Sequence, residues 1–250
     1  MKDEERGHRG HGSDACPLRL VSGELAPHPL EGVCRSFYEI AAHVERWVGP
    51  IEHVHHELAS EHVHIDVFHV PPNPKRELHT LVTAGMSTRP MKPPAEAAEC
   101  RLVELVLTLP RDWSAGPAMY ESAAHAWPLE GMIELARLPH ASGEWIWGGH
   151  SVADPDARAF HSSTALCAWL LACPMSLPAE FHFLRLPSGE QIAFFGLVPL
   201  YREELELKLH AGLDALLDRF RARRLSDVID PQRPNVASRI RPVRPPRRWR

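Results

Sequence analysis

Hydrophobic residues recur at helical spacing in three segments of the chain. In the first, apolar residues from Phe37 onward recur every three or four positions, and the pattern stops at Gly49-Pro50, a pair that ends helices. The second begins at Pro128, a residue favoured in the first helical turn. The third covers 200–223, where a leucine stripe has glutamates at its start and arginines at its end, as the helix dipole favours. These patterns predict three helices.

Extended runs between these helices predict a β-sheet. Residues 101–109 show the clearest alternation, with Val103, Leu105, Leu107 and Leu109 on one face and Pro110 ending the strand. The other extended runs are residues 51–58, 63–70, 79–84, 164–172, 180–186 and 190–198. Because strands and helices alternate without a regular βαβ rhythm, we predict an α+β fold. It would be a single domain with a mixed or antiparallel β-sheet flanked by about three helices.

Composition divides the chain into three parts. We predict a disordered leader over residues 1–33, the folded domain over 34–236, and a disordered arginine-rich tail over 237–250. No apolar run approaches the roughly 18–20 residues that cross a membrane, and no apolar segment of a secretory signal follows the N-terminus. The five cysteines are scattered without a CxxC pair. These observations favour a cytoplasmic protein with reduced thiols and no membrane partner.

The net charge of −4 conceals an acidic body and a basic tail. Residues 239–250 hold six arginines and no acid, so the rest of the chain has 22 basic and 32 acidic residues, a net charge near −10. An acidic body favours a basic partner. The preferred interpretation of the tail is a solvated end, and weak, salt-sensitive binding of nucleic acid is the alternative.

Histidines are concentrated in residues 53–66. A hairpin turning at 59–62 would place Val54 and Leu58 opposite Val67 and Val63, with His56 facing Ile65 on the same apolar side. The opposite face would then gather His53, His55, Glu57, His64 and Asp66. Histidines two positions apart on a strand can share a metal, and carboxylates can complete its coordination. A polar face directed at solvent or a partner is the preferred interpretation, so we assign no metal and no other cofactor.

Residues 149–153, Gly-His-Ser-Val-Ala, approach the nucleophile elbow G-x-S-x-G. The elbow needs a strand before the serine and a helix after it, with an acid and a base later in the chain. Asp156 and either His182 or His210 are available, although Ala153 replaces the final glycine. We assign no catalytic residue and predict that the protein is not an enzyme. A hydrolase using Ser151, or a metal-assisted one using the histidine face, is the alternative function.

Residues 79–87, His-Thr-Leu-Val-Thr-Ala-Gly-Met-Ser, predict a buried strand that ends at Gly85 and continues into a polar turn. No acid or base stands at a recognisable spacing from Ser87. We therefore expect a central scaffold strand whose turn, from Gly85 to Ser87, helps to shape a binding surface.

Ten segments are informative when they are taken in order: residues 37–39, 42–45, 49–50, 63–67, 79–87, 104–110, 134–139, 148–150, 198–205 and 230–235. Together they resemble the suppressor-of-fused domain in the compact single-domain form found in bacteria, and the resemblance extends over about 34–236. It implies a protein-binding module without catalysis. Metazoan relatives bind a peptide of a zinc-finger transcription factor. Bacterial forms resemble immunity proteins that neutralise polymorphic toxins, which makes toxin neutralisation one implied role.

The expected partner is therefore a protein or peptide, either basic or a toxin domain, bound in the cytoplasm. Exposed sheet edges of an acidic body can take a peptide strand by β-augmentation. The residues that we predict on or beside the binding surface are Glu57, His64, Asp66, Gly85 and Ser87.

Overall fold

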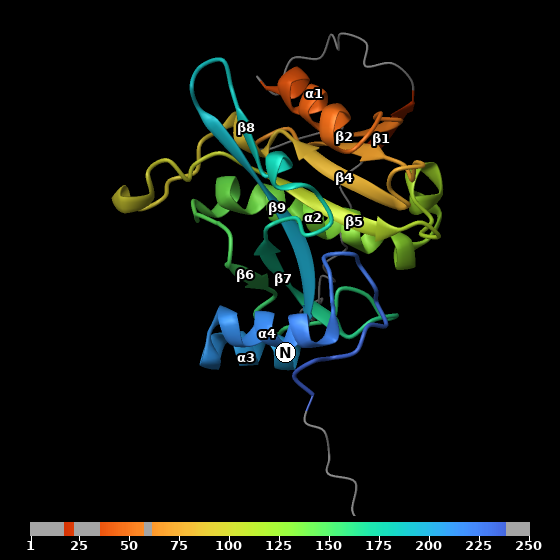
Figure 1. The fold of residues 1–250 in the computed structure, drawn as a ribbon, viewed down its shortest axis with the longest axis vertical. Coiled ribbons are helices and arrows are strands. Elements are labelled where there is room, and N and C mark those ends of the chain that lie inside the picture. The colour runs from red at the N-terminus through yellow and green to blue at the C-terminus, as the bar shows by residue number, and fades with distance from the viewer. Residues whose placement is uncertain (1–17, 23–35, 58–61, 239–250) are drawn as a thin grey trace, which may run out of the picture.

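One mixed β-sheet organises the chain (Figure 1). The structure, a computed structural model, describes residues 18–22, 36–57 and 62–238. The strand order is β1-β2-β3-β4-β5-β9-β7-β6, and β8 pairs with β9 outside this path. Neighbouring strands are antiparallel except β5 and β9, which are parallel. The strands are β1 (Leu18–Ser22), β2 (His53–Glu57), β3 (Asp66–Val70), β4 (Leu78–Ala84), β5 (Val103–Pro110), β6 (Ser151–Ala153), β7 (Leu166–Ala172), β8 (Phe183–Arg185) and β9 (Gln191–Tyr201).

Four α-helices cover the two faces of this sheet. They are α1 (Phe37–Trp47), α2 (Ala123–Ser142), α3 (Arg202–Ala211) and α4 (Leu213–Arg223). Alternate side chains of β9 show the layering, because Phe194 packs in the core beneath α1 whereas Phe195 packs in the core beneath α2. Further along β9, Leu200 packs with Phe220 of α4 in a third core. The predicted α+β class with a mixed sheet is therefore confirmed.

The structure departs from the predicted helices at two positions. Helix α2 begins at Ala123, so Pro128 lies inside it rather than at its start. The proline removes a backbone hydrogen bond to Ala124, and the burial of Trp127 and Leu129 in the core offsets this loss. The helix predicted over 200–223 is two helices that meet at Gly212 (φ 89°).

Residues 18–22 were predicted to lie in a disordered leader, but they form strand β1 along the outer edge of β2. A strand at the edge of a sheet leaves N–H and C=O groups without partners, and β1 supplies partners for those of β2. The rest of the predicted leader, and residues 239–250 of the predicted tail, lie outside the described residues. Within the described part of the chain, no helix is long and apolar enough to span a bilayer.

Two buried carboxylates, those of Glu104 and Glu204, form hydrogen bonds and an ion pair within the segments that resemble the family. Glu104 Oε1 accepts hydrogen bonds from the amide and hydroxyl of Ser87 and from the amide of Gly85, while Thr83 Oγ1 donates to Oε2 at 2.5 Å. Burial raises the pKa of Glu104. The other carboxylate, Glu204, forms a buried ion pair with Arg233. These residues therefore build the scaffold.

Candidate functional site

The pairing of β2 with β3 differs by one position from the predicted register. His53 lies opposite His69, Val54 opposite Phe68, and His55 opposite Val67. A shift of one residue moves every side chain to the other face, so the predicted grouping of histidines and acids on a single face is wrong. The physical reason is packing, because this register buries Val54 and Phe68 together beneath α1.

The observed register divides the histidines into two clusters on opposite faces. On the α1 side, His56 Nδ1 and His64 Nε2 donate to the same oxygen, Asp66 Oδ1, at 2.8 and 2.9 Å. On the α2 side, the ring of His69 lies 5.1–6.1 Å from three other imidazoles, measured between centroids. These three belong to His53, His55 and His79. Burial lowers the pKa of both His55 and His69 to about 3, so both rings are neutral at pH 7.

The five residues predicted to bind a partner lie near the ends of β2, β3 and β4. Glu57 accepts a hydrogen bond from the amide of Ile65, and a Cβ at Gly85 would stand 2.0 Å from the carbonyl oxygen of His64. Glu57, Asp66, Gly85 and Ser87 are buried, whereas the side chain of His64 is 22% exposed. Of these five, His64 is the one exposed enough to contact a partner directly, and the binding role of the five stays a prediction.

A different part of the molecule offers an open sheet edge. Among the described strands, β6 pairs with β7 alone, and Val152 stands opposite Trp169 in that pairing. Its other edge therefore presents backbone groups that a further strand can use. Sequence reasoning missed this edge because β6 is only three residues long and residues 149–153 were interpreted as a loop.

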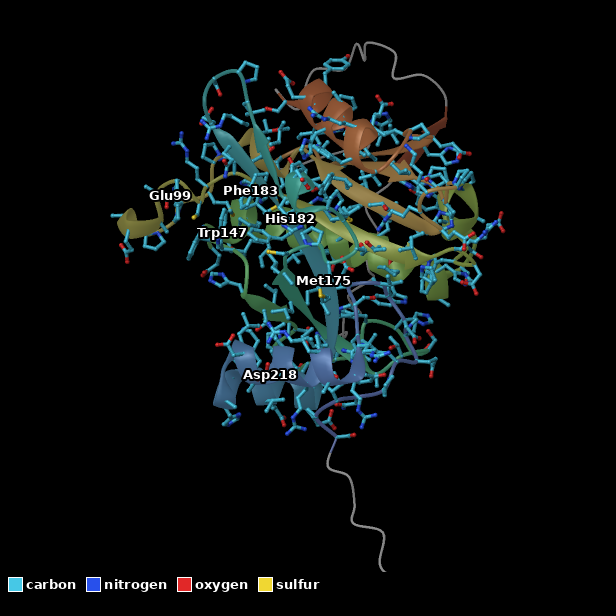
Figure 2. The ribbon with its side chains drawn as sticks, viewed as in Figure 1. Glu99, Trp147, Met175, His182, Phe183 and Asp218 are labelled. Carbon is cyan, nitrogen blue, oxygen red and sulfur yellow. The ribbon has the colours of Figure 1, made fainter. Side chains whose placement is uncertain are left out.

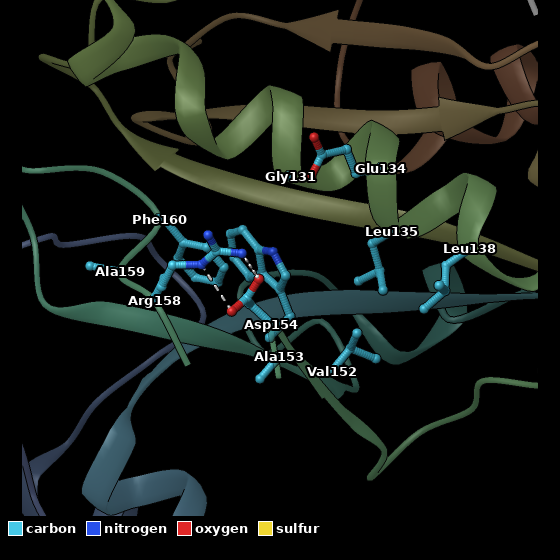
Figure 3. Close-up of a pocket in the computed structure, with 11 residues that line it drawn as sticks. Gly131, Glu134, Leu135, Leu138, Val152, Ala153, Asp154, Arg158, Ala159 and Phe160 are labelled. Atoms are coloured by element: carbon cyan, nitrogen blue, oxygen red, sulfur yellow. Dashed lines mark hydrogen bonds and ion pairs between the residues drawn. The ribbon is translucent and has the colours of Figure 1, made fainter. Parts of the chain in front are cut away.

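A pocket of about 510 Å³ opens between this edge and helix α2 (Figure 3). Leu135 and Leu138 line it from α2, and Val152 lines it from β6. Two charged features face the same space. One is the carboxylate of Glu134, whose pKa is raised by burial and by nearby Glu130. The other is the ion pair in which the Arg158 guanidinium donates to both oxygens of Asp154.

Two stacked aromatic rings, those of Phe160 and Trp169, line this pocket. The ring of Phe160 lies 4.6 Å from that of Trp169 and 5.3 Å from that of Trp127, and both pairs are stacked. Trp169 also lies tightly against α2, since a Cβ at Gly131 would stand 3.0 Å from its Nε1. A larger residue at 131 would push the indole away, so this glycine sets the depth of the pocket.

A second pocket, also of about 510 Å³, adjoins the segment that precedes β6. It is almost entirely apolar, with Trp147 and Phe195 on one side and Leu213 and Leu217 of α4 on the other. At its mouth, Met175 and Phe183 are 48% and 49% exposed (Figure 2). Segment 147–154 thus has a pocket at each end, one mixed apolar and charged and the other mainly apolar. Neither pocket was anticipated from the sequence.

Ser151 does not occupy a nucleophile elbow, because it begins strand β6 and no helix follows it directly. Lys208 Nζ lies 3.0 Å from Ser151 Oγ, and burial lowers the pKa of this lysine. His182 bonds to the carbonyl of Pro174, and His210 bonds to that of Glu206. Within the described residues, neither histidine bonds to Ser151, so the predicted acid and base do not assemble around it.

Comparisons with known proteins agree with this architecture. The family model described as "Suppressor of fused protein (SUFU)" matches residues 61–234, which is more than half of the chain. A solved SUFU homolog from Neisseria gonorrhoeae FA 1090 superposes with a TM-score of 0.58 at 15% identity, covering 81% of this chain and 97% of its own. At that identity the likeness shows the fold alone.

Two further structures are more distant. The Sufu-Fu complex gives a TM-score of 0.46 at 14% identity, covering 69% of this chain and 77% of the other. Suppressor of Fused from Drosophila gives 0.42 at 13% identity, and there the match covers 69% of this chain but 39% of the other. No curated protein matches the chain.

Proposed function

Because the chain belongs to the suppressor of fused family, we propose that it is a non-enzymatic protein-binding module that takes an extended peptide along the open edge of β6. The observation that carries this proposal is the position of that edge between two pockets. A peptide strand added to an edge gains affinity from backbone hydrogen bonds and specificity from side chains that enter pockets. Residues 147–154 offer both an open strand edge and pockets for side chains.

The chemistry of the α2 pocket favours apolar and basic side chains in the partner. Leu135, Leu138 and Val152 offer apolar surface, and Glu134 places a carboxylate beside it. The body of the protein is acidic as well, which increases the rate of encounter with a basic partner. We infer that the partner is a basic protein or peptide and that binding takes place in the cytoplasm. A basic toxin domain fits this chemistry, which supports an immunity role.

The experiment uses a partner purified with the protein from its native host and then measured by titration calorimetry. Val152→Arg places a bulky cation in the α2 pocket beside β6, where it blocks the strand and repels a basic ligand. We expect its dissociation constant to rise at least about tenfold, a loss of about 1.4 kcal/mol or more. Leu209→Arg is the matched control, because Leu209 is 67% exposed on α3 and lines neither pocket.

Unchanged affinity in Val152→Arg would contradict the β6 site. If His64→Arg weakened binding instead, the surface predicted from the sequence would replace it. For the immunity role, the measurement is growth of cells that express a captured toxin domain, with or without the protein. The hydrolase alternative gains support only if a fluorophosphonate probe labels the wild type and labelling is lost in Ser151→Ala.

A further inference from the structure

Three potential metal ligands converge where β2 ends and β3 begins. His56 Nδ1, His64 Nε2 and one carboxylate oxygen of Asp66 all lie within 4.8 Å of one another. Both imidazole nitrogens contact the same oxygen, Asp66 Oδ1, at 2.8 and 2.9 Å. Among the described residues, this is the one group of three or more histidine, cysteine or acidic side chains with such geometry. Two imidazoles and one carboxylate form a ligand set typical of zinc sites.

The register of the hairpin creates this convergence. His55 pairs with Val67, so one position further along the same register His56 stands opposite Asp66. His64 precedes Asp66 by two residues and therefore shares its face of the chain. The register predicted from the sequence placed His56 on the other face, away from both. Only the observed pairing of β2 with β3 brings His56 to the same face as His64 and Asp66.

The spacing of the three atoms suits a small divalent cation. With bonds of about 2.0–2.1 Å in a tetrahedral site, ligand atoms stand about 3.3 Å apart. The two nitrogens would each need to move roughly half an ångström from Asp66 Oδ1 to reach this value. In the metal-free arrangement each nitrogen donates a proton to the carboxylate. A bound metal would accept the lone pairs of these two nitrogens, and each displaced proton would move to the other ring nitrogen or be released to solvent.

Burial and access also fit a metal site. Asp66 is 1% exposed and His56 is 6% exposed, so two of the ligands are held firmly within the sheet. The side chain of His64 is 22% exposed and gives solvent a route to the cluster. Three protein ligands leave a fourth position of a tetrahedral site open to water.

The histidine cluster on the α2 side is chemically different. His69 Nε2 is hydrogen-bonded to His79 Nδ1 at 2.9 Å, and His55 Nδ1 is hydrogen-bonded to the hydroxyl of Tyr120. Glu52 Oε1 lies 3.4 Å from His53 Nε2, but within the described residues no three ligand atoms around these rings meet the spacing seen at Asp66. A high density of imidazoles is therefore not enough to indicate a metal site. The group at Asp66 is distinguished because two imidazole nitrogens converge on one carboxylate oxygen.

We propose that His56, His64 and Asp66 bind a divalent transition metal of the zinc class, which ties β2 to β3. This inference departs from the sequence-based prediction of no metal, and it is independent of peptide binding at β6. A metal there would stabilise the β2–β3 end of the sheet.

The test is a titration of the full-length protein with Co²⁺, whose visible absorption bands report tetrahedral coordination, followed by competition with Zn²⁺. His8, His11 and His28 lie outside the described residues, so His8→Gln, His11→Gln and His28→Gln are introduced first to remove their imidazoles. In this background we expect Co²⁺ bands that Zn²⁺ abolishes, together with a Zn²⁺-dependent rise in Tm.

Two ligand variants and one control decide the outcome. His64→Ala alters a partly exposed side chain, and Asp66→Asn keeps the size of the carboxylate while removing its charge, so at least one should fold normally. Each should raise the dissociation constant at least about tenfold. His210→Gln, on the exposed surface of α3, should leave it unchanged. Absence of Co²⁺ bands in the histidine-substituted background, or bands that persist unchanged in both ligand variants, would overturn the proposal.

Discussion

A single backbone contact explains why residue 85 is glycine. Gly85 has φ of 147°, and a Cβ built there would lie 2.0 Å from the carbonyl oxygen of His64 and 3.1 Å from Cα of Ile65. Both obstacles are backbone atoms, which cannot swing aside as a side chain can. The glycine thus lets the β4 turn lie directly against the chain that enters β3. That contact brings the amides of Gly85 and Ser87 to the carboxylate of Glu104.

Gly85→Ala should therefore destabilise the protein by about 2–4 kcal/mol, combining backbone strain with steric overlap. Gly189→Ala is the matched control. Gly189 also has a positive φ, 86°, but nothing lies within 4 Å of its Cβ position. The control isolates the cost of the backbone conformation, which we expect to be about 1 kcal/mol. Urea unfolding measures both variants, and equal losses would contradict the role assigned to the backbone contact.

At the scale of elements, a buried ion pair fastens the C-terminal segment to the start of α3. Arg233 Nη1 donates to Glu204 Oε1 at 2.7 Å, and its Nη2 donates to Oε2 and to the carbonyl of Pro199. Glu204 also accepts the amides of Tyr201 and Val236. One carboxylate therefore caps α3 and holds residues 233–236 in place.

Breaking this pair from one side should be costly, because a charged group is then left buried without its partner. We expect Arg233→Met to lower the free energy of unfolding by about 3–5 kcal/mol. The double variant Arg233→Met, Glu204→Gln removes both charges and should lose less stability than the two single variants added together. Denaturant unfolding of all four proteins measures the coupling. Strict additivity would show that the charges do not interact in this way.

Elements were more predictable than their pairing. Apolar periodicity located α1, β4, β5 and β9, because each buries one face or both against a large core. The register of β2 against β3 was not predictable in the same way. These strands place polar side chains on both faces, so the hydrophobic pattern does not discriminate between two registers. Packing of Val54 and Phe68 beneath α1 decides it, and that contact depends on a helix distant in sequence.

At the scale of the whole molecule, the residues that carry the family resemblance and those of the candidate binding site overlap only in part. Glu104, Glu204 and Arg233 lie in the segments that matched the family, and all three are buried in scaffold interactions. The pockets beside β6 are lined by residues from α2, β6, β7 and α4, and of the matching segments only 134–139 and 148–150 contribute to them. These come together only in the folded chain. The sequence could therefore predict the fold and the family, whereas the site needed the tertiary structure.

Acid stability of the whole molecule should depend on the buried histidines of the α2 side. His69 of β3 faces His53 and His55 of β2 and His79 of β4, with Tyr120 beside His55. Burial is the main cause that lowers the pKa of His69 from 6.5 to about 3. In the unfolded chain His69 therefore binds a proton near pH 6.5, whereas in the folded chain it stays neutral until the pH approaches 3. The stability linked to His69 is present above pH 6.5 and is lost as the pH falls toward 3.

His69→Phe removes this titration while keeping an aromatic ring at the position, so its free energy of unfolding should fall less steeply between pH 6.5 and 4. The shift sets an upper limit of about 5 kcal/mol, and with relaxation of the folded state we expect the difference from wild type to be about 1–3 kcal/mol across that interval. His210→Gln, at an exposed position on α3, should keep the slope of the wild type. Urea unfolding at a series of pH values measures all three proteins. A His69→Phe curve parallel to that of the wild type would show that other groups govern acid unfolding, since only a group with different proton affinities in the two states contributes to the slope.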